Sequence, residues 1–376
     1  MEKYNVYVGM DVHARSVTAQ ALNTDTGEIR KKRFGAGYGA AEIASWVNGL
    51  GRRVYCAYES GCTGVWLARD LRDLGIDCDV IAVSTLARST KDKQEKCDKL
   101  DARALLREIA NPLTTHSCVY IPTAKAEGRR DLCRIYTQTK DNAKRAKQEL
   151  ASFLCRHGYV WNEKTKTGKL RKPSGRTYEA WLSSIAFDDA LTQEAFCILR
   201  CKKDVAQNEL DQMRSVMDRL AKEEENAPFV DALCEIKGID ALNAMVVVSE
   251  FCDFERFASG RKVSSWLGTV PKNNSSGEKD AHGSITKAGN KYLRRTLTEG
   301  VCAISAWKRV PEKKRSDPPL ATTHLARRAN KRMMDRYHHL ADGLGKNPNK
   351  AKTAIVNELV RWCWVIGRAV QEEMTR

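Results

Sequence analysis

Apolar and polar positions along the first 110 residues predict alternating strands and helices. Residues 4–10 are almost continuously apolar, as in a strand that is buried on both faces. Residues 16–23 and 29–36 flank a TDTGE turn, and the second of these segments carries basic side chains on one side. These three segments predict a three-strand meander at the start of the chain.

Helical and strand patterns then alternate. A helical pattern, a fourth strand, a second helix, a fifth strand and a third helix follow one another over residues 40–50, 52–60, 63–75, 76–84 and 97–110. The resulting order, β-β-β-α-β-α-β-α, predicts an α/β domain.

The middle of the chain has a different pattern of polar and apolar residues. Residues 126–157 are polar with a narrow apolar stripe, and a second long helical stretch runs from about 188 to 225. The basic, Gly-containing segment 162–176 separates them. We interpret the two helices as an antiparallel arm, which typically mediates oligomerisation. Its basic side chains suit a phosphate backbone, but a solvated helix face explains them equally well.

From residue 227 the pattern predicts a mostly helical domain. The tight turn 236–239 lies between two helices and resembles a helix-hairpin-helix element, whose backbone amides can receive a phosphate. A Gly-, Ser- and Asn-rich stretch after Pro271 is too polar for a core, and a basic helix begins near Gly289. Taken alone, Ser275 or Ser276 before Gly277 is an ordinary loop serine.

The charge balance favours a polyanionic partner. The 376 residues contain 64 Lys and Arg against 47 Asp and Glu, a formal net charge of +17. Residues 286–353 hold 17 of the basic side chains and only five acidic ones, so the excess is concentrated near the C-terminus. We therefore expect nucleic acid to bind there rather than a small metabolite.

The cysteines and the apolar runs predict a reduced cytoplasmic protein. Thirteen cysteines are scattered without a CxxC pair, and no apolar run approaches the roughly 20 residues of a membrane span. Cys197 and Cys201 share a helix face without a nearby His pair, which favours core packing over metal binding. His338 and His339 have no acid or cysteine at ligand spacing, so we assign them no metal.

Four carboxylates are the candidate chemistry. Asp11 ends the first predicted strand and Glu59 ends the fourth, while Asp98 and Asp101 lie one turn apart on the third helix. An acid pair at a helix start is explained by the helix dipole alone. Combined with two strand-end acids, it predicts a Mg²⁺ site of the kind that cleaves phosphodiesters in RNase H-fold nucleases.

An actin-like ATPase begins in a similar way, with a strand that ends in Gly-x-Asp. Such a protein needs a Gly- and Thr-rich turn after the acid to hold phosphates, and here Asp11 is followed by Val-His-Ala-Arg. The sequence therefore argues against ATP binding. His13 is close enough in sequence to touch a phosphate, but we interpret it as a turn histidine.

Two sets of motifs together carry a family resemblance. GMDVH, YES-G and CDKLDAR contain the four acids, and IKGID and GTVPKNNSSGEKDAHGSITKAGNKYLRR follow in the second half. In order and approximate spacing they resemble the DEDD transposases of bacterial insertion sequences, the insertion-sequence-110 family. The chain departs from the family at Asp240, which replaces a Gly of the turn, and over 161–176, which is additional sequence.

The resemblance implies three domains: a RuvC-like RNase H-fold domain over 1–125, a helical coiled-coil arm over 126–226 and a C-terminal transposase domain over 227–376. It also implies that Asp11, Glu59, Asp98 and Asp101 bind one or two Mg²⁺ ions. In the family, the serine before glycine attacks the phosphodiester and forms a 5′-phosphoserine link. By position this serine is Ser276, with Ser275 as the nearest alternative.

The resemblance further implies the partners. The family is guided by a structured noncoding bridge RNA that pairs with donor and target DNA, and its composite active site requires a dimer or tetramer. Nucleic-acid contacts are expected from the basic residues of the two C-terminal motifs, Lys237, Lys287, Lys291, Arg294 and Arg295. The protein would act in the bacterial cytoplasm, at the nucleoid.

Two other functions remain open from the sequence. The acids could activate water in an RNase H-fold endonuclease or junction resolvase, with an inert serine. Alternatively, the protein could bind nucleic acid without catalysis, with the tetrad as a structural remnant.

Overall fold

The computed structural model describes residues 4–83, 98–114, 116–273, 282–302, 304 and 321–376, without the side chains of 98–101, 273 and 282. The chain forms two compact units, Met1–Thr123 and Ala124–Arg376. The expected boundaries of the arm, at 126 and 226, stay predictions.

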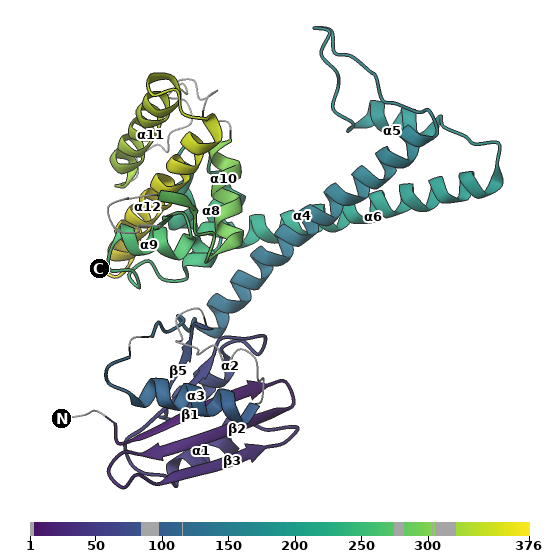
Figure 1. Ribbon diagram of the computed structural model, residues 1–376. Helices are drawn as coiled ribbons and strands as arrows, with labels where there is room; N and C mark the ends of the chain where they lie inside the picture. The colour runs from purple at the N-terminus through teal and green to yellow at the C-terminus, as the bar shows by residue number, and fades with distance from the viewer. Residues whose placement is uncertain (1–3, 84–97, 115, 274–281, 303, 305–320) are drawn as a thin grey trace. The chain divides into compact units, whose positions relative to one another are not determined.

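The first unit is built on a five-stranded mixed sheet (Figure 1). Its strands are β1 (Val6–His13), β2 (Ser16–Asn23), β3 (Ile29–Phe34), β4 (Val54–Glu59) and β5 (Asp77–Ile81), in the spatial order β3-β2-β1-β4-β5. The first three pair antiparallel, as the predicted meander requires, and β4 and β5 continue the sheet in parallel with β1. The expected order of strands and helices is confirmed.

Helices cover both faces of this sheet. One face packs its apolar side chains against α1 (Ala40–Asn48) and α2 (Trp66–Asp73), and the other packs against α3 (Asp98–Ala110). Helix α3 lies very close to β1, because a Cβ atom at Gly9 would come within 2.7 Å of the Ala102 carbonyl oxygen. The glycine in the middle of β1 therefore sets the position of α3 on the sheet.

The second unit begins with the expected pair of long antiparallel helices, α4 (Ala124–Arg156) and α6 (Ala190–Ala221). Contacts between them run in opposite chain directions: Cys133 contacts Met217, and Glu149 accepts a hydrogen bond from Lys202. The short helix α5 (Arg176–Ser183) packs where α4 ends and α6 begins. The expectation that Cys197 and Cys201 are core residues was wrong. Both are exposed, because they lie on the face of α6 turned away from its neighbours.

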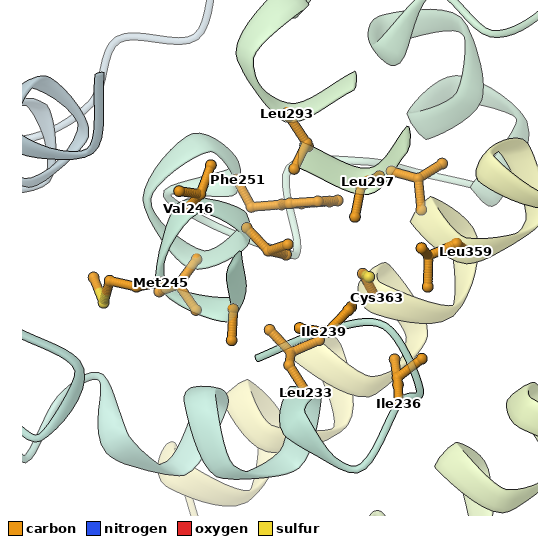
Figure 2. Packing of buried hydrophobic residues seen from close by; sticks show 14 of the residues in the cluster. Leu233, Ile236, Ile239, Met245, Val246, Phe251, Leu293, Leu297, Leu359 and Cys363 are labelled. Atoms are coloured by element: carbon orange, nitrogen blue, oxygen red, sulfur yellow. The ribbon is translucent and has the colours of Figure 1, made fainter. Parts of the chain in front are cut away.

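The remaining helices surround α8 (Ala241–Phe251), whose last eight residues are all buried. They are α7 (Ala227–Cys234), α9 (Gly260–Leu267), α10 (Lys291–Val301), α11 (Thr323–His338), the π-helical turn His339–Gly343 and α12 (Pro348–Met374). Figure 2 shows side chains of α7, α8, α10 and α12 meeting in this core. The same core takes in apolar residues of α4 and α6, so half of the arm is packed against these helices.

A two-stranded hairpin completes the second unit. Strands β6 (Pro271–Asn273) and β7 (His282–Ile285) pair antiparallel between α9 and α10. Within the described residues, no helix combines the length and the apolar character that crossing a membrane requires.

Candidate catalytic and nucleic-acid-binding sites

The structure brings Asp11 and Glu59 to neighbouring positions. Parallel pairing of β1 with β4 continues up to Met10 and Tyr58, so the next residue on each strand is the acid. Alternate residues of a strand share a face, which places both acids on the face that carries α3. The Asp11 side chain is only 18% exposed. Two of the four predicted ligands thus lie at the carboxyl ends of adjacent central strands.

Helix α3 brings the other two acids toward this edge. Asp98 is its first residue and Asp101 follows in the first turn. Figure 1 shows α3 across the sheet with its beginning at the end to which the β1 arrow points. The side chains of Asp98 and Asp101 lie outside the described residues. Among the side chains that are described, no three acids, cysteines or histidines gather as metal ligands. The four-carboxylate site stays a prediction.

His13 touches the candidate site. Its Nε2 lies 3.1 Å from the Asp11 Oδ2, and Tyr38 donates a hydrogen bond to the His13 carbonyl oxygen. The spacing of two residues along β1 puts both side chains on one face of the strand. The interpretation of His13 as a turn residue is therefore incomplete, because the ring also contacts the acid.

Residues 274–281, with Ser275 and Ser276, lie outside the described residues, but the stem that carries them is described. Thr286 donates its backbone N–H to Val270 and Lys287 donates to Gly268. Gly268 and Gly289 have positive φ angles of 73° and 121°, and added Cβ atoms would come within 2.2 and 2.1 Å of backbone oxygens. Only glycine fits at these two positions, so the G-x-x-P and K-x-G-N motifs meet by backbone contact.

A buried glutamate that the sequence analysis did not identify connects this region to the arm. Glu250 of α8 accepts hydrogen bonds of 2.8 and 3.0 Å from the guanidinium of Arg134 on α4. It also accepts a 2.7 Å bond from the amide of Asn290, which caps α10 through the Leu293 N–H. The conspicuous sequence signal is an acid inside the otherwise apolar stretch AMVVVSEF.

Two of the arginines expected to bind nucleic acid have acceptors inside the protein. Arg295 donates two hydrogen bonds of 2.5 and 2.6 Å to Asp141 and one to Glu299, and Arg294 donates to the Leu267 carbonyl oxygen. The bond to Asp141 raises the pKa of Arg295 and lowers the pKa of Asp141. These arginines hold α10 against α4 and α9. Lys287, by contrast, is exposed, in a left-handed conformation with φ 55°.

The predicted phosphate-binding turn is largely occupied by internal contacts. The Lys237 N–H donates to the side-chain oxygen of Asn330, and the Ile239 N–H donates to the Ile236 carbonyl oxygen. Both amides therefore already have acceptors inside the protein and do not offer a hydrogen bond to a phosphate. Figure 2 shows Ile236 and Ile239 directed into the core. Asp240 has an extended backbone and caps α8 through the Asn243 N–H, which explains why glycine is not needed there.

Helix α11 carries a strongly basic surface. Five exposed cations, which we call the α11 basic face, are Arg327, Arg328, Lys331, Arg332 and Arg336. The last two also pair with the buried carboxylate of Glu358, at 2.6 and 3.0 Å, which fixes them in place. A shallow hollow of about 480 Å³ lies along this helix. The excess of basic residues over 286–353 indicated this region, but none of its residues was among the predicted nucleic-acid contacts.

Comparisons with known proteins agree with this arrangement. A sequence model described as Transposase IS116/IS110/IS902 family matches residues 230–316, the span from α7 through the hairpin and α10. The putative transposase y4qE of Sinorhizobium fredii is 28% identical over 373 residues, 97% of this chain and 89% of the relative. The transposase for insertion sequence element IS1533 of Leptospira borgpetersenii is 27% identical, over 90% of this chain and 97% of its own length.

Both relatives extend through the acid-bearing sheet, the arm and the C-terminal helices, so the likeness is not limited to the matched span. These comparisons support the transposase class for this protein. Within that class they support the IS110 family, the transposases of IS110-type insertion sequences.

Proposed function

We propose that the protein is an RNA-guided, site-specific DNA recombinase that cuts and rejoins DNA through a serine. The observation that carries the proposal is the adjacency of Asp11 and Glu59 at the ends of parallel strands β1 and β4. The strand order β3-β2-β1-β4-β5 and the start of α3 at the same edge support a RuvC-like RNase H fold for residues 1–125.

The donor set suits Mg²⁺. Carboxylate oxygens are the ligands that this ion prefers, and two partly buried acids on adjacent strands are held in place by backbone pairing. Asp11, Glu59, Asp98 and Asp101 would hold one or two ions. Bound Mg²⁺ would stabilise the negative charge that develops at the phosphodiester when a hydroxyl attacks it, an attack that is slow without the ion. His13, in contact with Asp11, would position that carboxylate.

Ser276 is the proposed nucleophile. Its Oγ would lose its proton to solvent and form a bond to the scissile phosphorus while the bond to the 3′ oxygen breaks, and the 3′ oxygen would take up a proton from solvent and leave as a hydroxyl. The reverse attack by a 3′ hydroxyl would restore the serine and reseal DNA. The glycine contacts beneath the hairpin support this role, because they fix the two ends of the loop that carries Ser276.

The partners follow from the family and from charge. Donor and target DNA and a bridge RNA would lie against the second unit, where the basic excess is concentrated, with pairing between RNA and DNA supplying sequence choice. A site that combines the acids of one domain with a serine of another suits a dimer or tetramer. Lys287, Lys291 and the α11 basic face are the proposed backbone contacts.

A denaturing gel tests the chemistry. Purified protein is incubated with Mg²⁺, the RNA of its element and end-labelled target DNA, and label that stays on the polypeptide is measured. We expect the adduct to disappear in Ser276→Ala and in Asp11→Asn. It should persist in Ser275→Ala and in Glu28→Gln, an exposed acid of the β2–β3 turn.

Each alternative function gives a different pattern. Cleavage that continues in Ser276→Ala but stops in Asp11→Asn would identify a water-using nuclease and overturn the serine. Wild-type protein that binds DNA without cleaving it under these conditions, with Asp11→Asn identical, would identify a noncatalytic binding protein.

A further inference from the structure

The additional segment between the two long helices is an ordered basic finger, which we define as residues 163–172. Lys164 and Leu170 form a β-bridge, and the Thr165 N–H donates to the Lys169 carbonyl oxygen at 2.7 Å. Gly168, with φ 79°, closes the turn at the tip. Figure 1 shows this loop projecting from the end of the arm beside α5. Its backbone contacts make it a defined hairpin rather than an open linker.

An aromatic cluster supports the base of the basic finger. The Trp161 indole donates to the Arg171 carbonyl oxygen at 3.0 Å, and its ring packs against Tyr178 and Trp181 at centroid distances of 5.2 and 5.3 Å. Helix α5 is in turn tied to α6 by Lys203, which donates to both carboxylate oxygens of Glu179. The finger is therefore held by packing on the arm itself.

The finger and the segment that follows it concentrate positive charge. Six exposed cations stand against the single acid Glu163 over residues 163–176: Lys164, Lys166, Lys169, Arg171, Lys172 and Arg176. None of the six forms an ion pair with a described carboxylate. Lys125 and Lys202 of the arm, in contrast, both do. Five of these like charges lie on the ordered hairpin and Arg176 begins α5, so they repel one another, and a polyanion would relieve that repulsion.

We propose that the basic finger is a nucleic-acid contact that binds the phosphate backbone at the far end of the arm. A backbone contact fits because the finger offers flexible ammonium groups, which pair with phosphates of any sequence. The inference rests on the proposed function only for the class of ligand. It requires neither Ser276 nor the acid site.

The test compares two triple variants of the full-length protein in EDTA, where strand cleavage is absent. The finger variant is Lys166→Gln, Lys169→Gln, Lys172→Gln. The matched control is Lys144→Gln, Lys147→Gln, Lys222→Gln, three exposed lysines on or next to α4 and α6 with the same loss of charge. Fluorescence anisotropy is measured with a duplex DNA and with an RNA hairpin of equal length, each over a series of salt concentrations.

Each lost phosphate contact lowers the slope of log K against log salt by about 0.9 for duplex DNA. We expect the slope of the finger variant to be smaller than that of wild type by up to about 2.7. A fourfold rise in salt would then weaken its binding about 40-fold less than it weakens wild-type binding. The control should keep the wild-type slope. Loss with DNA alone or with RNA alone would identify the nucleic acid that the finger contacts.

Limited trypsin digestion gives an independent test, because five of the six cations are also cleavage sites; the exception is Lys172, which precedes Pro173. Bound nucleic acid should slow cleavage within 164–176 relative to cleavage elsewhere. Equal slopes in the two variants with both nucleic acids, and no protection from trypsin, would overturn the proposal. A finger variant that loses binding to anionic lipid vesicles but not to nucleic acid would overturn it too. A failure of the covalent-adduct experiment leaves these readings unaffected.

Discussion

At the scale of single residues, Glu250 shows how a charge is accommodated in an apolar core. Its side chain is 1% exposed, so partners inside the protein must replace the water that its polar oxygens lose on burial. Arg134 supplies two charged hydrogen bonds and Asn290 a third. The three residues come from α8, α4 and the cap of α10, so one carboxylate holds three helices in register.

We expect Glu250→Ala to lower the free energy of unfolding of the second unit by about 2–4 kcal/mol, since breaking a buried pair leaves its partners unpaired. The loss should stay below the upper end because the Arg134 side chain is 34% exposed and regains some water. Urea unfolding followed by circular dichroism measures it. The control is Glu372→Ala, whose exposed pair with Arg368 should cost under about 0.5 kcal/mol. Similar losses in both would contradict the buried role.

Asp141 gives a pH-dependent prediction. The hydrogen bonds from Arg295 hold its pKa below the ordinary 3.8, so the pair adds stability above that pH and loses it as pH falls further. Asp141→Asn should therefore cost up to about 1 kcal/mol near pH 6, a modest value because the side chain is 40% exposed. The difference from wild type should shrink below pH 3.8 in urea melts. A difference that is constant with pH would exclude the pair as its cause.

Sequence identified some of these residues and missed others for a physical reason. Asp11 and Glu59 were predictable because the end of an apolar strand pattern is visible in the sequence, and parallel strands bring their carboxyl ends together. Glu250 was not, because its partner lies 116 positions away and no periodicity links them. Arg295 shows the same limit in reverse. Its basic charge suggested DNA, but Asp141, 154 positions away in the sequence, accepts its hydrogen bonds.

At the scale of elements, the hairpin stem depends on two glycines. Gly268 ends α9 in the left-handed region, and Gly289 lets the chain after β7 pass against Trp266. Both the conformation and the close backbone exclude a side chain. A disturbance at these glycines would therefore reach strands β6 and β7.

We expect Gly268→Ala to destabilise the second unit by more than about 2 kcal/mol, since a Cβ atom would overlap the Ala288 carbonyl. Thermal unfolding by calorimetry measures the loss. The matched control is Gly128→Ala in α4, where the added methyl group meets open space and should stabilise the helix by about 1 kcal/mol. A tolerated Gly268→Ala would contradict the tight stem.

The longest and most periodic elements were predictable from the sequence. The strands and helices of 1–110 and the long helices α4 and α6 match the patterns, because their burial is periodic. Helix α5 and the β6–β7 hairpin were not predicted. Strands of three and four residues are too short to show a period. The backbone contacts of Gly268 and Gly289, which flank the two strands, hold them together. The basic finger was recognised only as added sequence, because its bridge joins two residues in a polar run.

At the scale of the whole molecule, charge divides unequally. Residues 1–123 hold 17 basic and 15 acidic side chains, and residues 124–376 hold 47 and 32. Each unit has its own apolar core, so each should unfold in its own transition. The nearly neutral unit contains the acids, and the basic unit contains the surfaces suited to phosphate. This division of charge fits a protein that binds nucleic acid with one part and activates the scissile phosphate with the other.

The two transitions make the metal site measurable without any reaction. If Asp11, Glu59, Asp98 and Asp101 bind Mg²⁺, 10 mM Mg²⁺ and a dissociation constant of about 1 mM should stabilise the first unit by about 1.4 kcal/mol, a shift of roughly 6–11 °C in its midpoint. The second unit's transition, identified because Gly268→Ala lowers it, should not move. Glu59→Gln should abolish the shift, and Asp25→Asn in the β2–β3 turn should keep it.

Sodium chloride at equal ionic strength separates binding from screening, because screening acts on any charged surface. The acids repel one another without a cation, so Glu59→Gln should also raise the metal-free midpoint of the first unit. A substitution that raises the midpoint without Mg²⁺ and also removes the gain with Mg²⁺ has the signature expected for a metal ligand. A shift in Glu59→Gln as large as in wild type would place Mg²⁺ elsewhere, and the acids at the ends of β1 and β4 would then need another explanation.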